Sequence, residues 1–291
     1  MKTIKYFFEF ISVISLFCIF KLVGLKNASN LGGLIGKLFG PLFRSKKITR
    51  QNIKNGLGKI DSQKEKEIID GMWSNIGRTF AEYVYLKKFK FNKNNYNHMK
   101  ISGLQYLDEI KKNNESAIFY SGHFANFELM AMELDKFGIK CAAIYRPLNN
   151  FFLNPLMEYL RMKYICPNQI PKGRIGMREI INKIKNGYSI ALMVDQRVGE
   201  GPRELFFNRP AHTTTIPAQI ALKYDCKLVP ISLIRKEGIR FEMTIHEPYK
   251  IKKTSDEIND TRNITIKINQ IIEKMVIENP KQWIWSHNRW K

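Results

Sequence analysis

The chain has 291 residues, of which 44% are hydrophobic, so it is long enough and apolar enough to bury a sizeable core. This composition excludes an intrinsically disordered polypeptide. The chain carries 48 Lys and Arg against 26 Asp and Glu, a formal net charge of +22. Such a charge attracts polyanions, so nucleic acid, anionic lipid and acidic protein are all candidate partners. A general bias of the composition toward Ile, Lys and Asn accounts for about half of the charge.

An apolar run lies close to the start of the sequence. Residues 6–20 read YFFEFISVISLFCIF, and only Glu9 interrupts their apolar character. The run extends to Leu25 if Lys21 reaches toward the lipid headgroups, which gives a marginal membrane-spanning helix of about 20 residues. The following KLVGLKNASN offers no good cleavage site, so a retained anchor over residues 1–25 is favoured over a signal peptide. The basic residues that follow the run predict a cytoplasmic body.

A second apolar segment, residues 31–43, reads LGGLIGKLFGPLF and is rich in glycine. Two interpretations have equal weight: a helix that lies in the membrane interface, or a segment that packs into the protein core. We expect a helical, membrane-associated region over residues 26–98, between the anchor and the remaining chain.

Residues 61–86 carry the clearest helical pattern, with apolar side chains recurring at steps of three and four. Ser62 and Glu65 fit a capping box at the start of this helix. Residues 87–98 are polar and basic, and they are predicted to form a loop.

Beyond residue 98, apolar strands alternate with helices. The predicted strands cover residues 116–120, 139–145, 188–195, 227–234 and 239–246. The predicted helices cover residues 126–137, 150–163, 174–186, 215–224 and 256–278. This alternation predicts an α/β domain over residues 99–291, in which helices flank a mostly parallel mixed sheet.

Three polar residues each stand at or just past the end of a predicted strand, namely His123, Arg146 and Asp195. Open α/β sheets bind their ligands outside the carboxyl ends of the strands, so we expect these three side chains to converge.

Residues 121–128 read SGHFANFE and combine a histidine with a carboxylate. A histidine that takes a proton from an alcohol needs an acceptor on its other ring nitrogen, and Glu128 is the carboxylate nearest to His123 in sequence. Helical positions five apart point about 140° away from each other, so the two meet only if His123 precedes the helix. Gly122 permits the required turn, and free N–H groups of the helix would then face an oxyanion.

The spacing of His123 and Glu128 does not establish this chemistry by itself. A solvated histidine at a strand end and a glutamate on an exposed helix face are favoured by about two to one, because HxxxxE is short and common.

Five blocks make the motif specific: GHFANFE (122–128), YRPLNN (145–150), DQRVGEGPR (195–203), FFNRPAHTTT (206–215) and QWIWSHNRWK (282–291). In this order they resemble the lipid A biosynthesis acyltransferases, the late lauroyl and myristoyl transferases of Gram-negative bacteria, over nearly the whole chain. The resemblance implies a glycerol-3-phosphate-acyltransferase-like fold at the cytoplasmic face of the inner membrane. It implies acyl-acyl carrier protein as donor and a phosphorylated glucosamine lipid as acceptor, with neither metal nor cofactor.

The resemblance also implies roles for individual residues. His123 matches the family's general base, Glu128 its carboxylate, and Arg161 an arginine that is important for activity. The residues expected to bind substrate are Arg146, Asp195 and Gln196. Arg146 suits a phosphate group or a surface ion pair equally well. The tryptophans of the last block suit either the membrane interface or the closure of the core.

The sequence is also compatible with rival functions. The nearest is the same chemistry on a lysophospholipid, a glycolipid or an aminolipid. A tethered nucleic-acid-binding protein is disfavoured because the cations are spread over the chain and no recognised motif appears. A cysteine nucleophile, Cys141 or Cys166, has no histidine nearby in sequence. We expect a monomer whose partners are acyl carrier protein, the lipid acceptor and anionic membrane lipid, and not nucleic acid.

Overall fold

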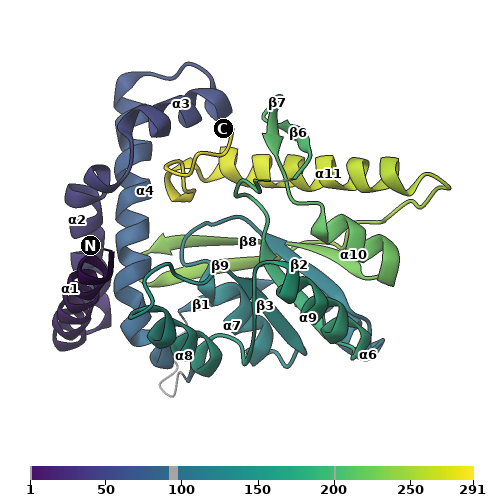
Figure 1. Cartoon of the computed structure of the whole chain (residues 1–291), viewed down its shortest axis with the longest axis horizontal. Helices are drawn as coiled ribbons and strands as arrows, with labels where there is room; N and C mark the ends of the chain where they lie inside the picture. The colour runs from purple at the N-terminus through teal and green to yellow at the C-terminus, as the bar shows by residue number, and fades with distance from the viewer. Residues whose placement is uncertain (1, 92–97, 200) are drawn as a thin grey trace.

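The computed structural model describes residues 2–91, 98–199 and 201–291. Helices pack on both faces of a central sheet, and a helical layer lies along one side (Figure 1). The helices of this layer, and those that connect it to the first strand of the sheet, are α1 (Lys2–Val23), α2 (Leu25–Phe43), α3 (Lys46–Leu57), α4 (Ser62–Glu82), η1 (Tyr83–Tyr85) and α5 (Leu86–Lys90). The remaining helices are α6 (Leu104–Lys112), α7 (Glu128–Lys136), α8 (Asn154–Tyr164), α9 (Arg174–Lys185), α10 (Ile216–Tyr224), α11 (Glu257–Glu278) and η2 (Pro280–Gln282).

The central sheet has seven strands in the order β1-β9-β8-β2-β5-β3-β4. Their bounds are β1 Met99–Ser102, β2 Ala117–Ser121, β3 Cys141–Tyr145, β4 Asn168–Pro171, β5 Ser189–Met193, β8 Lys227–Glu237 and β9 Arg240–Ile245. Neighbouring strands pair in parallel except β8 with β9, which confirms the mostly parallel mixed sheet. Strands β6 (Arg203–Phe206) and β7 (Arg209–His212) form a separate antiparallel hairpin.

Strand β2 lies at the centre of the sheet and is buried on both faces. Ala117 and Phe119 belong to one hydrophobic cluster, which contains side chains of α6, α7 and α8. Ile118 and Tyr120 belong to the other, which contains side chains of α9, α10 and α11. Side chains of a strand point alternately to opposite faces, so an uninterrupted apolar sequence is what this position requires.

The segment 31–43 shows features of both interpretations left open by the sequence. It belongs to α2, which lies beside α4 (Figure 1). A Cβ atom at Gly32 would lie 2.5 Å from the carbonyl oxygen of Gly77 in α4, so only glycine permits this close packing. Leu38 and Leu42, on another face of α2, are exposed.

Two expectations for the region around α4 are wrong. The helix is capped by Asp61, whose carboxylate accepts a hydrogen bond of 2.8 Å from the backbone N–H of Lys64, and not by Ser62. The first part of the predicted loop 87–98 is helical, because α5 buries Phe89 against the ring of Phe241 in β9. Residues 92–97 of that predicted loop lie outside the described residues.

Helices α7 and α8 begin later than their sequence patterns predict. They start at Glu128 and Asn154, whereas the patterns begin at residues 126 and 150. The residues in between belong to the irregular segments that follow β2 and β3, and these segments form the candidate site.

Candidate active site

His123 and Asp195 occupy equivalent positions after two neighbouring strands. Strands β2 and β5 are parallel, and their register places Ser121 level with Met193. His123 and Asp195 each come two residues later, so they meet at the carboxyl edge of the sheet. Oδ1 of Asp195 lies 2.6 Å from Nδ1 of His123, and Oδ2 accepts the backbone N–H of His123 at 2.8 Å. One carboxylate therefore fixes both the ring and the main chain of His123.

Asp195 is buried behind His123, with 3% of its surface exposed. Its Oδ2 atom also accepts a hydrogen bond of 2.7 Å from the indole N–H of Trp283. Burial alone would raise the pKa of Asp195, but the interaction with His123 and these donors outweigh burial and lower the pKa to about 2. An ionised Asp195 accepts the proton of Nδ1, which leaves the lone pair of His123 on Nε2.

A strained turn connects His123 to α7. Ala125 has a φ of 46°, a left-handed conformation that residues with a Cβ atom seldom adopt. Its carbonyl oxygen accepts hydrogen bonds from Asn75 Nδ2 at 2.9 Å and Thr79 Oγ1 at 3.0 Å, both on α4. These contacts offset the cost of the turn, so α4 helps to hold His123 in place.

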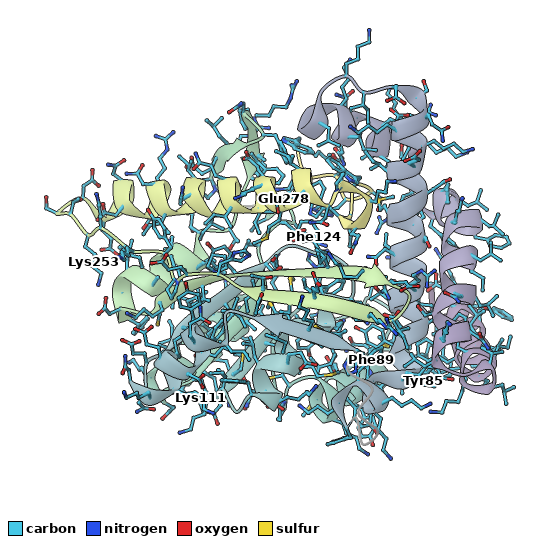
Figure 2. All side chains as sticks on the ribbon, turned by 180° about the vertical axis from the view of Figure 1, so that it is seen from behind. Tyr85, Phe89, Lys111, Phe124, Lys253 and Glu278 are labelled. Atoms are coloured by element: carbon cyan, nitrogen blue, oxygen red, sulfur yellow. The ribbon has the colours of Figure 1, made fainter. Side chains whose placement is uncertain are left out.

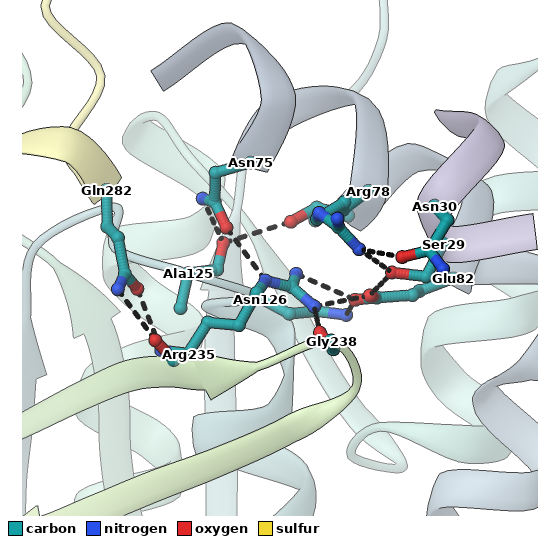
Figure 3. A network of polar contacts seen from close by, with 11 residues as sticks. Ser29, Asn30, Asn75, Arg78, Glu82, Ala125, Asn126, Arg235, Gly238 and Gln282 are labelled. Carbon is teal, nitrogen blue, oxygen red and sulfur yellow. Dashed lines mark hydrogen bonds and ion pairs between the residues drawn. The ribbon is translucent and has the colours of Figure 1, made fainter. Parts of the chain in front are cut away.

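A buried polar network reinforces the same turn from α4 and β8 (Figure 3). Glu82 of α4 is fully buried, and Arg235 of β8 donates to its two carboxylate oxygens at 2.5 and 3.0 Å. Asn126, next to Ala125, donates to the same carboxylate at 2.8 Å. A buried charge is tolerated when it is paired and hydrogen-bonded, and here the pairing joins the turn to two distant elements.

Glu128 contacts Arg161 and not His123. Its Oε1 atom accepts hydrogen bonds from Arg161 Nη2 at 2.6 Å and Nε at 3.1 Å, and it also contacts the hydroxyl of Tyr83. Among the described residues, the carboxylate that hydrogen-bonds His123 is Asp195. The expected contact between His123 and Glu128 is therefore wrong. Asp195 reaches Nδ1 of His123 from the neighbouring strand instead.

Arg161 lies on α8 with its guanidinium largely buried. Burial opposes its charge, but Glu128 and then Tyr83 outweigh burial and hold the pKa of Arg161 above its ordinary value. Its Nη1 atom is buried and has no hydrogen-bond partner among the described residues. Arg161 is therefore a permanent cation, and one buried N–H group of its guanidinium has no partner among the described residues.

A cavity of about 450 Å³ opens beside His123. Its lining includes five of the six expected site residues: His123, Glu128, Arg146, Arg161 and Gln196. The sixth, Asp195, is not among the lining residues and contacts His123. The side chain of Gln196 approaches Nε2 of His123, with Nε2 atoms 3.4 Å apart.

The cavity combines apolar and basic walls, as a site for an amphiphilic ligand would. The apolar side chains come from α7, the α8 end and the sheet: Met130, Ala131, Ala143, Ile165 and Ala191. The basic side chains are Arg146, Arg161, Lys172 and Arg197. Burial, together with the charge of Arg146, lowers the pKa of Lys172.

A model of the family described as bacterial lipid A biosynthesis acyltransferase matches residues 1–291. The chain belongs to this family. Curated relatives of this acyltransferase include the lipid A biosynthesis lauroyltransferase of Escherichia coli (strain K12), 23% identical over 270 residues, which cover 90% of this chain and 84% of the relative. The palmitoleoyltransferase of the same strain is 24% identical over 272 residues with the same coverage. A lipid A biosynthesis acyltransferase of Haemophilus influenzae is 28% identical over 200 residues, 66% of this chain and 60% of the relative.

The C-terminal block supplies residues to this acyltransferase that the sequence interpretation did not assign. His287 lines the cavity, and its Nε2 atom accepts the backbone N–H of Arg197 at 2.9 Å. Burial lowers the pKa of His287 to about 4. Trp283 and Trp285 are buried, so core closure is confirmed for these two tryptophans. The QWIWSHNRWK block was the available signal, but its contacts depend on the fold.

The rival cysteine nucleophile has no support from the geometry of the acyltransferase. Cys141 and Cys166 are buried, and neither is among the residues that line the cavity. The thiol of Cys166 donates to the carbonyl oxygen of Cys141 at 3.0 Å, an internal contact within the core.

In the described part of the chain, no group of three or more His, Cys, Asp or Glu side chains is arranged to hold a metal ion.

Proposed function

We propose that this acyltransferase transfers a fatty acyl chain from acyl-acyl carrier protein to a hydroxyl of a phosphorylated glucosamine lipid, a precursor of lipid A. The observation that carries the proposal is the His123–Asp195 contact of 2.6 Å at the edge of a partly apolar cavity. Family membership and the names of the curated relatives support the lipid A precursor as acceptor.

His123 acts as a general base in this proposal. Asp195 holds the proton on Nδ1, so Nε2 takes the proton of the acceptor hydroxyl. The hydroxyl oxygen attacks the thioester carbonyl of the donor, and a tetrahedral oxyanion forms. As the carbon–sulfur bond breaks, His123 returns the proton to the departing thiolate, and the carrier leaves as a free thiol. Asp195 stabilises the imidazolium between these two steps without becoming protonated itself.

Arg161 is the side chain best suited to the developing negative charge. It is charged at all relevant pH values, it lines the cavity, and its Nη1 atom has no partner among the described residues. Glu128 and Tyr83 orient it from behind. In this account Glu128 is required because it positions Arg161, and the donors that meet the oxyanion are Arg161 and backbone N–H groups after His123.

The remaining lining residues suit the two ends of the substrates. Guanidinium and ammonium groups bind phosphate, so Arg146 and Lys172 are assigned to a phosphate of the acceptor or of the phosphopantetheine arm. Gln196, whose amide lies 3.4 Å from Nε2 of His123, is assigned to the acceptor hydroxyl beside the base. The apolar side chains around Ala131 and Ala191 receive the acyl chain. Acyl carrier proteins are cytoplasmic, so we place the catalytic body at the cytoplasmic face of the inner membrane.

Mass spectrometry of membrane lipids tests this function. A strain that lacks the chain is compared with the same strain carrying the wild-type protein or the His123→Ala variant. The account predicts lipid A that is lighter by one acyl group in the deletion strain, restored by the wild type and not by the variant. An unchanged lipid A, with a missing acyl group in a phospholipid or an aminolipid instead, would assign a different acceptor.

A further inference from the structure

Helix α1 is the one described helix that is long and apolar enough to cross a membrane. Its 22 residues measure about 33 Å at 1.5 Å per residue. If α1 crosses the bilayer, Lys2 lies on the opposite side from the catalytic body. If α1 lies along the surface, both lie on the same side. The contacts of α1 distinguish these two arrangements.

The first half of α1 is attached to the loop between β3 and α8. Asn150 donates hydrogen bonds to the carbonyl oxygen of Tyr6 at 2.9 Å and to Glu9 Oε2 at 3.1 Å. The rings of Phe7 and Phe10 pack on Phe152, with centroids 5.8 and 6.1 Å apart. The same loop contains Arg146, so this end of α1 lies next to the cavity wall.

The second half of α1 is attached to the end of α4. Phe17 and Phe20 are buried, and both rings pack on Phe80. The hydroxyl of Tyr85 donates to the carbonyl oxygens of Phe20 and Lys21 at 2.9 and 3.0 Å. Figure 2 shows Tyr85 where the α4 end meets the N-terminal helices. One face of α1 therefore contacts the body along the whole helix.

The other faces of α1 and α2 form what we call the apolar platform. Its exposed residues are Ile4, Phe8, Ile11, Ile19, Leu22, Leu34, Leu38, Phe39, Leu42 and Phe43. Exposed lysines accompany them: Lys2, Lys5, Lys21, Lys26 and Lys37. A large apolar face beside several cations matches a bilayer surface with anionic headgroups.

We propose that the apolar platform binds the surface of an anionic bilayer, with α1 and α2 in the plane of the interface, and that α1 does not cross the membrane. A spanning α1 would either break its contacts with Asn150, Phe80 and Tyr85 or draw those elements into hydrocarbon. The in-plane arrangement keeps every contact and covers about 10 apolar side chains that water otherwise surrounds. It also places the β3–α8 loop, and hence the cavity, at the level of the lipid headgroups.

Labelling of single cysteines from known sides of the membrane tests the proposal. Cys18 is the exposed native cysteine, so Cys18→Ala provides the background. Lys2→Cys reports the start of α1, and Lys253→Cys, on an exposed part of the body, is the reference. A membrane-impermeant maleimide is applied to inside-out vesicles and to spheroplasts. Both cysteines are expected to react in inside-out vesicles only. Reaction of the cysteine at position 2 in spheroplasts, or its failure to react in inside-out vesicles, overturns the in-plane arrangement.

A second measurement tests the contribution of α2. The variant Leu42→Glu with Phe43→Glu places two charges on the platform, whereas Ile258→Glu changes an equally exposed apolar residue on α11, away from α1 and α2 (Figure 1). Purified protein is bound to vesicles of phosphatidylethanolamine and phosphatidylglycerol. We expect the platform variant to bind about 10-fold more weakly and Ile258→Glu to bind as the wild type does. Equal binding by the two variants contradicts a role for α2. Neither experiment depends on the acceptor or on the catalytic residues.

Discussion

The Nδ1 atom of His123 lies 2.6 Å from Oδ1 of Asp195, although 72 positions separate the two residues in sequence. The contact results from the order of the strands, because β2 and β5 are parallel neighbours and each residue follows its strand by two positions. Glu128, only five positions from His123, binds Arg161 instead. The two carboxylates therefore have separate roles that substitutions can distinguish.

Asp195→Asn is expected to reduce kcat by about 10³- to 10⁴-fold with little change in KM, because an amide favours the wrong tautomer of the imidazole. The measurement is steady-state kinetics with acyl-acyl carrier protein as donor. Thermal unfolding of the variant serves as the control for folding. A variant that folds and turns over at a near-normal rate would show that Asp195 does not hold the proton of His123.

Glu128 and Arg161 are expected to act as one unit. Glu128→Gln leaves Arg161 buried beside a neutral group, and Arg161→Gln leaves Glu128 without its main donor, so each variant loses most of the effect of the pair. A double-mutant cycle on kcat/KM should give a coupling energy of about 1–3 kcal/mol. If the losses are additive, Glu128 acts independently of Arg161 and the positioning role assigned to it fails.

The position of His123 can be predicted from the sequence, but its carboxylate partner cannot. The motif placed His123 in a turn before a helix, and the strand pattern placed His123, Arg146 and Asp195 at the same edge of the sheet. In the structure His123 precedes α7, and all three residues follow strands at the carboxyl edge of the sheet, where Asp195 contacts His123. The partner of His123 was predicted from proximity along the chain, but strand order and register determine it. Neither can be derived from one sequence, so proximity along the chain points to Glu128 and not to Asp195.

The same reason explains the elements that the sequence did not reveal. Strands β1 and β4 have four residues each and lie at the two edges of the sheet, so they lack a long apolar run. Long amphipathic or apolar segments, such as the helix predicted at 174–186, were found nearly at their true bounds. Short edge strands depend on their neighbours for stability, and local sequence patterns do not contain that information.

Trp283→Phe is expected to lower kcat by about 10-fold without changing KM, because it removes one hydrogen bond to the ionised Asp195 while keeping an aromatic ring. Trp285→Phe is the matched control. Trp285 is equally buried and packs on Trp283, but its indole N–H binds the carbonyl oxygen of Pro280. If both variants lose activity to the same extent, Trp283 contributes packing alone.

His287 is expected to make the stability depend on pH. Burial lowers its pKa from 6.5 to about 4, so the folded chain resists the protonation that the unfolded chain accepts. The resulting stability is fully present above pH 6.5 and is lost as the pH falls toward 4, by about 1–3 kcal/mol after allowance for partial exposure. Chemical unfolding at pH 7.5 and pH 5, compared between wild type and His287→Gln, measures the difference. An identical pH dependence in the two proteins contradicts this assignment.

The most direct test of the proposed chemistry is the turnover of the purified His123→Ala variant. Wild type and variant are incubated with acyl-acyl carrier protein and a phosphorylated glucosamine lipid acceptor, and the product is measured by mass spectrometry. The wild type is predicted to add one acyl group to the acceptor. The variant, with an unchanged unfolding temperature, is predicted to be slower by at least about 10³-fold. A folded variant that forms the product at a near-normal rate would contradict the account.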